Sequence, residues 1–253
     1  MEINNLERFR QCIAQNRIAI GTSISLSDPA VSELAADAGM DFTWIDMEHA
    51  PLNIESVLGH IMALRGTSCA PFVRVPWNEH WVIKPILDMA PAAVIVPMVC
   101  TAEEAEAAVA ACRYPLRGRR GCGVRRGVRY GKTNFFDYLK QSDEEPMVII
   151  QIEHIDALPH LDKILRVPGI GSICVGPCDL SGSMGILNRL DDPELNRVID
   201  EICRKTKAAG VMLGTAAGNF PAWKARGVNW IALTGDCVSQ YAFYQNLLKE
   251  VRQ

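Results

Sequence analysis

The sequence lacks the long apolar segments that mark membrane and secreted proteins. No apolar run reaches about 18 residues, the length that argues for a membrane-spanning helix. The chain starts with MEINNLERFRQCIAQNR, which is polar and amphipathic and has no apolar stretch of the kind found in signal peptides. We therefore expect a cytoplasmic protein with no membrane partner.

A surplus of positive charge is also missing. The 26 lysines and arginines are outnumbered by 29 aspartates and glutamates, which gives a net charge of −3 and a pI of about 6.0. This balance argues against binding nucleic acid as a partner. The nine cysteines form no Cys-x-x-Cys pair, and several stand inside apolar runs. They predict buried thiols in a reducing compartment, and neither disulfides nor a thiolate zinc site.

What the sequence does contain is the composition and length of a globular protein. Hydrophobic residues make up 49% and charged residues 22%, which excludes a disordered or fibrous chain. At about 150 residues per domain, 253 residues predict one or two domains. Divided by eight, the length gives about 32 residues per unit, enough for one strand, one helix and two short connections, and (β/α)₈ barrels typically have about 250 residues.

Eight short β-rich runs recur along the chain. Most are continuously apolar, as expected for parallel strands that helices cover on the outside. The predicted strands span 18–25, 42–47, 71–75, 93–98, 147–153, 172–176, 211–215 and 230–235.

Helical patterns with recognisable start signals lie between these runs. Thr101 with Glu104 forms a capping box, and Asp192-Pro193 opens another helix. The predicted helices run to residue 38 and over 54–65, 102–113, 193–208 and 237–251. Regular alternation of eight strands with helices favours an α/β (β/α)₈ TIM barrel over a doubly wound sheet. We predict one barrel domain over residues 1–253.

One connection is much longer than the others. The predicted strands that start at 93 and 147 are 54 residues apart, and RYPLRGRRGCGVRRGVRYGK (113–132) between them carries seven of the 18 arginines and no acid. Long connections in compact domains are usually functional or interfacial. We interpret this arginine-rich arm as an active-site rim and subunit contact, with a nucleic-acid site or a solvated loop as the alternatives.

Charged and polar side chains stand at the carboxyl ends of the predicted strands, where barrel enzymes carry their active sites. A single one could be a paired core charge. Several that converge on one rim are difficult to explain by structure alone, because buried charges are unfavourable unless they are paired or bound to metal. These residues are Asp46, Glu48, His49, Arg74, Gln151, Glu153 and Asp179.

Each of these residue types fits one part of a reaction. Glu153 and Asp179 are the ligand type for a hard divalent cation such as Mg²⁺ or Mn²⁺. A carboxylate from Asp46 that orients the imidazole of His49 would make a general base. Arg74 can pair with a carboxylate or lie beside an oxygen that becomes negative.

The turn GPCD (176–179) completes the set. It can offer the backbone N–H groups of Cys178 and Asp179 to an anion, because Pro177 has none. A metal, an arginine and a base around one anion describe enolate chemistry next to a carboxylate, so the predicted substrate class is a 2-oxo acid.

Competing chemistries fit the sequence less well. A Schiff-base aldolase needs a lysine at a strand end, and all eight lysines fall outside the predicted strands. No feature clearly lowers the pKa of Cys178, which argues against a nucleophilic thiol. His154 and His160 fit core or surface positions better than ligand positions. A non-catalytic barrel that only binds a ligand is disfavoured by the complete set of strand-end residues.

With these residues in place, the sequence resembles the HpcH/HpaI aldolase family of metal-dependent class II pyruvate aldolases, which act on substrates such as 4-hydroxy-2-oxoheptanedioate and 2-keto-3-deoxy sugar acids. The resemblance covers roughly residues 18–217. It is carried by IDMEHAP (45–51), VRVP (73–76), LDMAPAAVIVPMV (87–99), RYPLRGRRG (113–121), QIE (151–153), VPGI (167–170) and GPCDLSGSMG (176–185).

The resemblance implies roles for these residues. Glu153 and Asp179 would bind the divalent metal (Mg²⁺ or Mn²⁺, with Co²⁺ as a further option), and His49, supported by Asp46, would be the catalytic base. Arg74 would bind the keto oxygen of pyruvate. Gln151 would lie beside metal or substrate, and the amides of Cys178 and Asp179 would take the carboxylate. Glu48 and Asp88 would be supporting or interface groups.

The implied reaction is reversible cleavage of a 4-hydroxy-2-oxo acid to pyruvate and an aldehyde. The alternative is oxaloacetate decarboxylation or a macrophomate-synthase-like C–C bond formation through the same enolate. The implied assembly is a hexamer, a trimer of dimers in which partners exchange the last helix.

The sequence also departs from the family pattern. Cys178 stands where the family usually has Asn or Ala. Ala90-Pro91-Ala92 replaces a Gly-Ala-Gln-like turn, and we expect this to change the mouth of the site. The region 214–240 matches loosely and is expected to line the aldehyde pocket, so the sequence leaves the identity of the aldehyde open.

Overall fold

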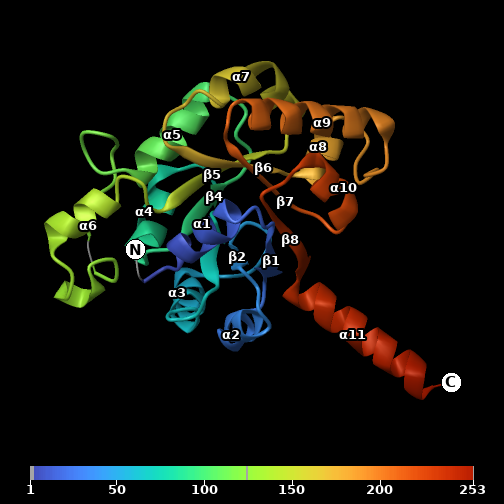
Figure 1. The fold of residues 1–253 in the computed structure, drawn as a ribbon, viewed down its shortest axis with the longest axis horizontal. Coiled ribbons are helices and arrows are strands. Elements are labelled where there is room, and N and C mark those ends of the chain that lie inside the picture. Colours follow the sequence, from blue (N-terminus) through green and yellow to red (C-terminus); the bar gives the residue numbers. More distant parts are fainter. Residues whose placement is uncertain (1–2, 124, 253) are drawn as a thin grey trace.

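Eight parallel strands form one closed barrel in chain order (Figure 1), in a computed structural model that describes residues 3–123 and 125–252. Every strand predicted from the sequence overlaps an observed one, which confirms the predicted (β/α)₈ fold. The strands are β1 (Ala19–Ile24), β2 (Phe42–Asp46), β3 (Ala70–Arg74), β4 (Ala93–Val96), β5 (Met147–Ile152), β6 (Ile170–Val175), β7 (Met212–Ala216) and β8 (Trp230–Gly235).

Helices surround the barrel. They are α1 (Leu6–Ala14), α2 (Ala30–Asp37), α3 (Ile54–Ala63), α4 (His80–Asp88), α5 (Ala102–Cys112), α6 (Phe135–Gln141), α7 (Leu161–Ile164), α8 (Pro177–Ser183), α9 (Pro193–Ala208), α10 (Phe220–Arg226) and α11 (Asp236–Val251), with 3₁₀ turns η1 (Arg129–Gly131) and η2 (Ile155–His160).

Helices α2, α3, α5, α9 and α11 overlap the helices that the sequence predicted. The capping box of Thr101 and Glu104 is present at the start of α5. Four of the longer helices were missed. Helix α4 has no side-chain cap and contains Pro85, and α1 follows Asn5, which has a left-handed backbone and no side-chain cap. Helices α6 and α10 were missed although Asn134 and Asn219 cap them.

Large and small residues interdigitate inside the barrel. The rings of Phe42 and Phe72 stack with centroids 4.8 Å apart, and Trp230 meets Phe42 edge-on at 5.5 Å. Two glycines make this possible: a Cβ on Gly21 would lie 2.5 Å from the Phe42 ring, and one on Gly214 would lie 1.9 Å from the Trp230 ring. The interior is therefore a packed apolar core up to the level of the strand ends.

Helix α1 closes the end of the barrel where the strands begin. Leu6 and Phe9 are buried, and the ring of Phe9 lies 4.9 Å from that of Phe72. Asn5 donates from Nδ2 to the carbonyl oxygen of Cys69, just before β3, at 2.7 Å. The opposite end, where the strands finish, is the end left for chemistry.

The arginine-rich arm lies at the closed end, and the prediction that it lies near the mouth of its own barrel is wrong. Arg120 donates to the carbonyl oxygen of Leu87 at 3.0 Å and Arg126 to that of Met89 at 2.7 Å, both at the end of α4. The physical reason is the direction of the outer helices. Each one returns the chain to the end of the barrel where the next strand starts, so the connection from α5 to β5 must lie at that closed end.

The turn Ala90-Pro91-Ala92 also lies at the closed end, so the expectation that it changes the mouth of the site is wrong. These residues join α4 to β4 and precede the strand, and the carbonyl oxygen of Pro91 accepts a hydrogen bond from Asn4 at 3.2 Å. The departure from the family pattern therefore lies at the closed end and does not shape the mouth.

Helix α11 extends away from the barrel (Figure 1). None of its residues is buried, although Tyr241, Phe243 and Leu247 are among its apolar side chains. Its first residue is fixed: the Asp236 carboxylate accepts hydrogen bonds from the Ser25 amide at 2.8 Å and the Ser25 hydroxyl at 2.6 Å. Across the described residues, no helix combines the length and apolarity needed to cross a membrane.

The interior packing predicts that Gly214→Ala destabilises the barrel. The added methyl group would overlap the Trp230 ring, and overpacking of this kind typically lowers the free energy of unfolding by about 1–3 kcal/mol. Urea denaturation measures the change. Gly218→Ala is the matched control, because a Cβ there meets no atom within 4 Å; equal stability of the two variants would contradict the packing.

Candidate active site

Strand alternation brings Asp46 and Arg74 together at the open end. Phe42 and Trp44 point into the barrel on β2, so Asp46, two residues further, points the same way, and Arg74 follows Phe72 on β3 in the same manner. The two residues are register partners on neighbouring strands. Both side chains are almost completely buried.

Arg74 is the centre of an ion-pair network. Its Nε and Nη2 donate to Oδ1 and Oδ2 of Asp46 at 2.9 and 2.5 Å, and its Nη1 lies 2.8 Å from Oε2 of Glu48. The guanidinium also lies 5.0 Å from the centroid of the Trp44 ring. A guanidinium has five N–H groups, and the bidentate pair with Asp46 uses two of them, so the plane of the group is fixed while other N–H groups stay available for a ligand.

His49 lies beside this network and is accessible. Its side chain is 60% exposed, and its Nε2 lies 3.8 Å from Oε2 of Glu48. The Asp46 carboxylate does not bond to the His49 imidazole, although the sequence led us to expect this. In addition to its bonds with Arg74, it accepts hydrogen bonds from the backbone N–H groups of Glu48 and His49 at 3.0 and 3.3 Å. Asp46 therefore shapes the loop that carries His49, and Glu48 is the carboxylate near the imidazole.

Glu153 is the most deeply buried carboxylate of the mouth, with 1% exposure directly after β5. Its Oε1 accepts the backbone N–H of Met98 at 2.8 Å, and its Oε2 accepts the Gln151 amide Nε2. A Cβ at Gly176 would lie 2.5 Å from Oε2, so the end of β6 requires a glycine to make room. The Gln151 Oε1 is buried without a hydrogen-bond partner.

Burial raises the pKa of Glu153 to about 7, and the negative charges of Glu48 and Asp179 add to this effect, while the Met98 amide and Arg74 oppose it. Burial also raises the pKa of Glu48. With Asp46, four carboxylates share the mouth with one arginine. The site therefore has an excess of negative charge that a cation would neutralise.

Asp179 and Cys178 lie in the first turn of α8, and both are exposed. Pro177 begins the helix, so the free backbone N–H groups of this turn belong to the residues that follow it. Burial and the neighbouring Asp179 raise the pKa of the Cys178 thiol, which agrees with the prediction that it is not a nucleophile.

Over residues 3–123 and 125–252, no group of three or more His, Cys, Asp or Glu side chains is arranged to hold a metal ion. Glu153 and Asp179 are close enough for the charge of Asp179 to act on Glu153. Two carboxylates would suit Mg²⁺, which is typically bound through one or two carboxylates while water and substrate fill the other positions. The unpartnered Gln151 Oε1 adds a further oxygen beside Glu153.

The other predicted groups lie outside this site. All eight lysines lie on helices or connections and none on a strand, as the argument against a Schiff base required. Asp88 lies at the closed end, where its Oδ1 is 3.6 Å from Arg120 Nη2. Two contacts of the site could not be predicted from the sequence. The ion pair of Glu48 with Arg74 depends on how the loop after β2 folds, and the Met98 bond to Glu153 comes from a backbone amide, which every residue except proline has.

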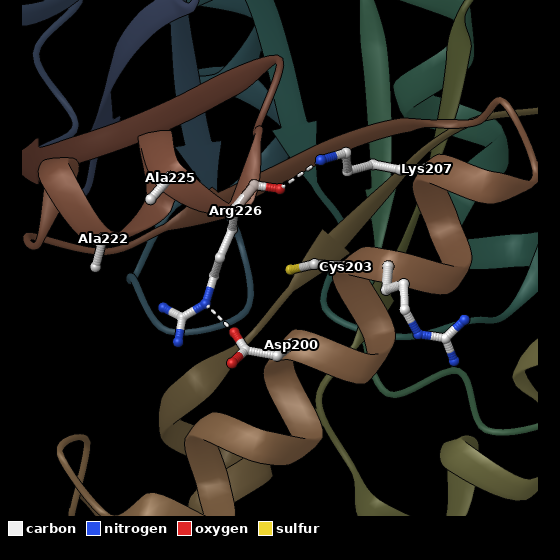
Figure 2. A pocket seen from close by; sticks show the side chains of 7 residues that line it. Asp200, Cys203, Lys207, Ala222, Ala225 and Arg226 are labelled. Atoms are coloured by element: carbon white, nitrogen blue, oxygen red, sulfur yellow. Dashed lines mark hydrogen bonds and ion pairs between the residues drawn. The ribbon is translucent and has the colours of Figure 1, made fainter.

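A separate hollow of about 550 Å³ lies between α9 and α10 on the outside of the barrel (Figure 2). Two of its charged side chains are hydrogen-bonded: Arg226 Nε donates to Asp200 at 2.7 Å, and Lys207 donates to the Arg226 carbonyl oxygen at 3.2 Å. Burial raises the pKa of Cys203 to about 12. The hollow therefore offers no reactive group.

The fold and the site define a (β/α)₈-barrel protein with an arginine–carboxylate cluster at the strand ends. The chain belongs to the HpcH/HpaI aldolase/citrate lyase family, whose model matches residues 20–235. This confirms the resemblance found in the sequence.

Similar relatives are aldolases. A hydroxypyruvate/pyruvate aldolase of Roseobacter denitrificans is 34% identical over 235 residues, which cover 91% of each chain. A 4-hydroxy-2-oxo-heptane-1,7-dioate aldolase of Salmonella paratyphi C is 37% identical over 215 residues, covering 84% of this chain and 81% of the relative. A family member from Burkholderia cenocepacia superposes with a TM-score of 0.88 at 29% identity, covering 96% of this chain and 98% of the other.

The buried carboxylate predicts a pH-dependent stability difference for Glu153→Gln in the presence of EDTA. The folded-state pKa of about 7 exceeds the unfolded value of about 4.3, so ionising Glu153 destabilises the fold progressively as the pH rises between these values. The variant should match the wild type near pH 4 and be more stable at pH 8, by on the order of 3 kcal/mol.

Thermal or urea unfolding at both pH values measures this difference. The new amide is accommodated when the Gln151 amide reverses and accepts with its free Oε1. Glu106→Gln on the surface of α5 is the control, because that carboxylate is exposed. A stability difference that does not change with pH would contradict the burial argument.

Proposed function

We propose that the protein is a metal-dependent aldehyde-lyase that reversibly cleaves a 4-hydroxy-2-oxo acid to pyruvate and an aldehyde. The observation that carries the proposal is the buried Glu153 beside Arg74 in a mouth with surplus negative charge. Four carboxylates would repel an anionic substrate. A bound cation would offset this repulsion, so the mouth needs a cation in order to bind a 2-oxo acid. The aldolase relatives support the same reaction class.

Glu153 and Asp179 would hold the divalent cation, with Mg²⁺, Mn²⁺ or Co²⁺ as candidates. When bound, such an ion acts as a Lewis acid that stabilises negative charge developing on the 2-oxo oxygen. Gln151 orients Glu153 through its Nε2 and has its Oε1 free toward a ligand.

Arg74 would bind the 2-oxo group of the substrate. Two of its N–H groups donate to Asp46, and its Nη1 forms an ion pair with Glu48, so N–H groups remain that can donate to an oxygen that becomes negative as the C3–C4 bond breaks. Because both partners fix the guanidinium before substrate arrives, no side-chain entropy is lost at that step. The backbone N–H groups of Cys178 and Asp179 would take the substrate carboxylate.

His49 would be the general base. Its exposed imidazole can reach the 4-hydroxyl group, accept its proton as the C3–C4 bond breaks, and return a proton in the synthetic direction. Asp46 contributes by holding the His49 backbone, and Glu48 by lying beside the imidazole.

We also propose that the protein is a homo-oligomer, a trimer of dimers in which partners exchange α11. An exposed helix with several large apolar side chains is typical of an interaction surface. A reducing, cytoplasmic location is part of the same proposal, since all nine cysteines are free thiols.

The reaction predicts pyruvate release that depends on a divalent cation. In a screen of 4-hydroxy-2-oxo acids coupled to lactate dehydrogenase, we expect EDTA to abolish activity and Mn²⁺, Mg²⁺ or Co²⁺ to restore it. Borohydride should trap no adduct, since no lysine lies at a strand end. Full activity in chelator would overturn the proposal. Oxaloacetate cleaved with a higher kcat/KM than every hydroxy-oxo acid would favour the decarboxylase or C–C bond-forming alternative.

If α11 is exchanged between partners, replacing its exposed apolar residues by charged ones should disrupt the assembly. In light scattering, the double variant Phe243→Asp and Leu247→Asp should have a lower mass than the wild type, because two carboxylates would be buried in the exchanged interface. Glu250→Gln on the same helix is the control. A monomeric wild type, or a double variant that assembles normally, would contradict the exchange.

A further inference from the structure

Met98 has an unusual backbone at the mouth of the barrel. It follows β4 by two residues and has φ of +55°, in the left-handed region that favours glycine. Its side chain is 38% exposed, so apolar burial does not account for a methionine held in this conformation. Strained backbone of this kind is found preferentially at functional sites.

The left-handed conformation directs the Met98 amide at a carboxylate. Its N–H donates to Oε1 of the buried Glu153 at 2.8 Å. Other described non-glycine residues with positive φ donate elsewhere: Ala90 and Asn16 bond to the carbonyl oxygens of Leu87 and Ile13 in ordinary helix-end turns. Met98 therefore differs from these two residues, because its N–H donates to a side-chain carboxylate and theirs donate to backbone carbonyl oxygens.

The two oxygens of Glu153 are held from two neighbouring strand ends. Met98 after β4 holds Oε1, and Gln151 at the end of β5 holds Oε2. An ionised carboxylate has about four lone-pair sites, so two remain for a further ligand after these bonds are made. Because both oxygens are held, the carboxylate plane is fixed and the remaining lone pairs have defined directions.

We propose that Met98 is a positioning residue that acts through its backbone: its left-handed conformation aims one amide at Glu153 and orients this carboxylate for a divalent cation. The proposal rests on the proposed function in one respect, that Glu153 is a ligand to the cation. Hydrogen-bonding partners of metal ligands commonly change metal affinity by about 10- to 100-fold when they are removed.

Four variants separate the backbone from the side chain. Met98→Gly and Met98→Asn lose the thioether but tolerate a left-handed backbone, whereas Met98→Val and Met98→Ile keep an apolar side chain and disfavour it. We expect the first two to bind Mn²⁺ within about twofold of the wild type in calorimetric titrations of the metal-free protein. The two β-branched variants should bind Mn²⁺ about 10-fold more weakly or worse.

Leu116→Val is the matched control for a β-branched residue at a left-handed position, because Leu116 has φ of +71° and is fully exposed in the arginine-rich arm. It should bind Mn²⁺ like the wild type. Circular dichroism melts establish that each variant is folded at the titration temperature, and all variants are titrated at a lower temperature if a β-branched variant requires it, because only the β-branched variants test the backbone.

The opposite pattern, with weak Mn²⁺ binding by the glycine and asparagine variants and normal binding by the β-branched ones, would overturn the proposal in favour of the side chain. Unchanged binding by all four variants would overturn it as well. Failure of the wild type to bind Mn²⁺ at all would instead count against the proposed function, so the two failures are distinguishable.

Discussion

Closure of eight parallel strands into one barrel is the constraint on which the site depends. On every strand, alternate side chains must point inward, and all strands finish at the same end. The lower inward positions are filled by Phe42, Phe72 and Trp230, so they are dry and apolar. The last inward positions therefore hold charged groups against a floor of low polarity, where electrostatic interactions are strong.

As a consequence, the charged side chains at the mouth strongly influence one another's pKa values. Arg74 is held by Asp46 and Glu48. Glu153 lies deeper, none of the described residues forms an ion pair with it, and burial raises its pKa to about 7. A fixed arginine beside a buried carboxylate without an ion-pair partner would suit the proposed function, in which the site binds a metal ion and an anionic substrate together. The same environment would destabilise a protein that had no use for it.

Much of the fold could be predicted from residue patterns. All eight strands were found because buried parallel strands are continuously apolar, and helix α5 was found because its capping box has a sequence signature. Helices α6 and α10 were missed although Asn134 and Asn219 cap them. Helix α4 was missed because it has no side-chain cap and contains Pro85. The arginine-rich arm was assigned to the wrong end because length and charge do not report the direction in which a connection runs.

The sequence by itself determined the barrel, the family and the residues that gather at the strand ends, because period-two alternation and ordered motifs are local properties of the chain. Only the tertiary structure decided how these residues pair: Asp46 binds Arg74 and the loop amides, and Glu48 lies beside His49. It alone revealed the Met98 amide on Glu153. The reason is physical: a pairing across strands, or a bond from a backbone N–H, depends on register and backbone conformation, which are fixed only when the barrel closes.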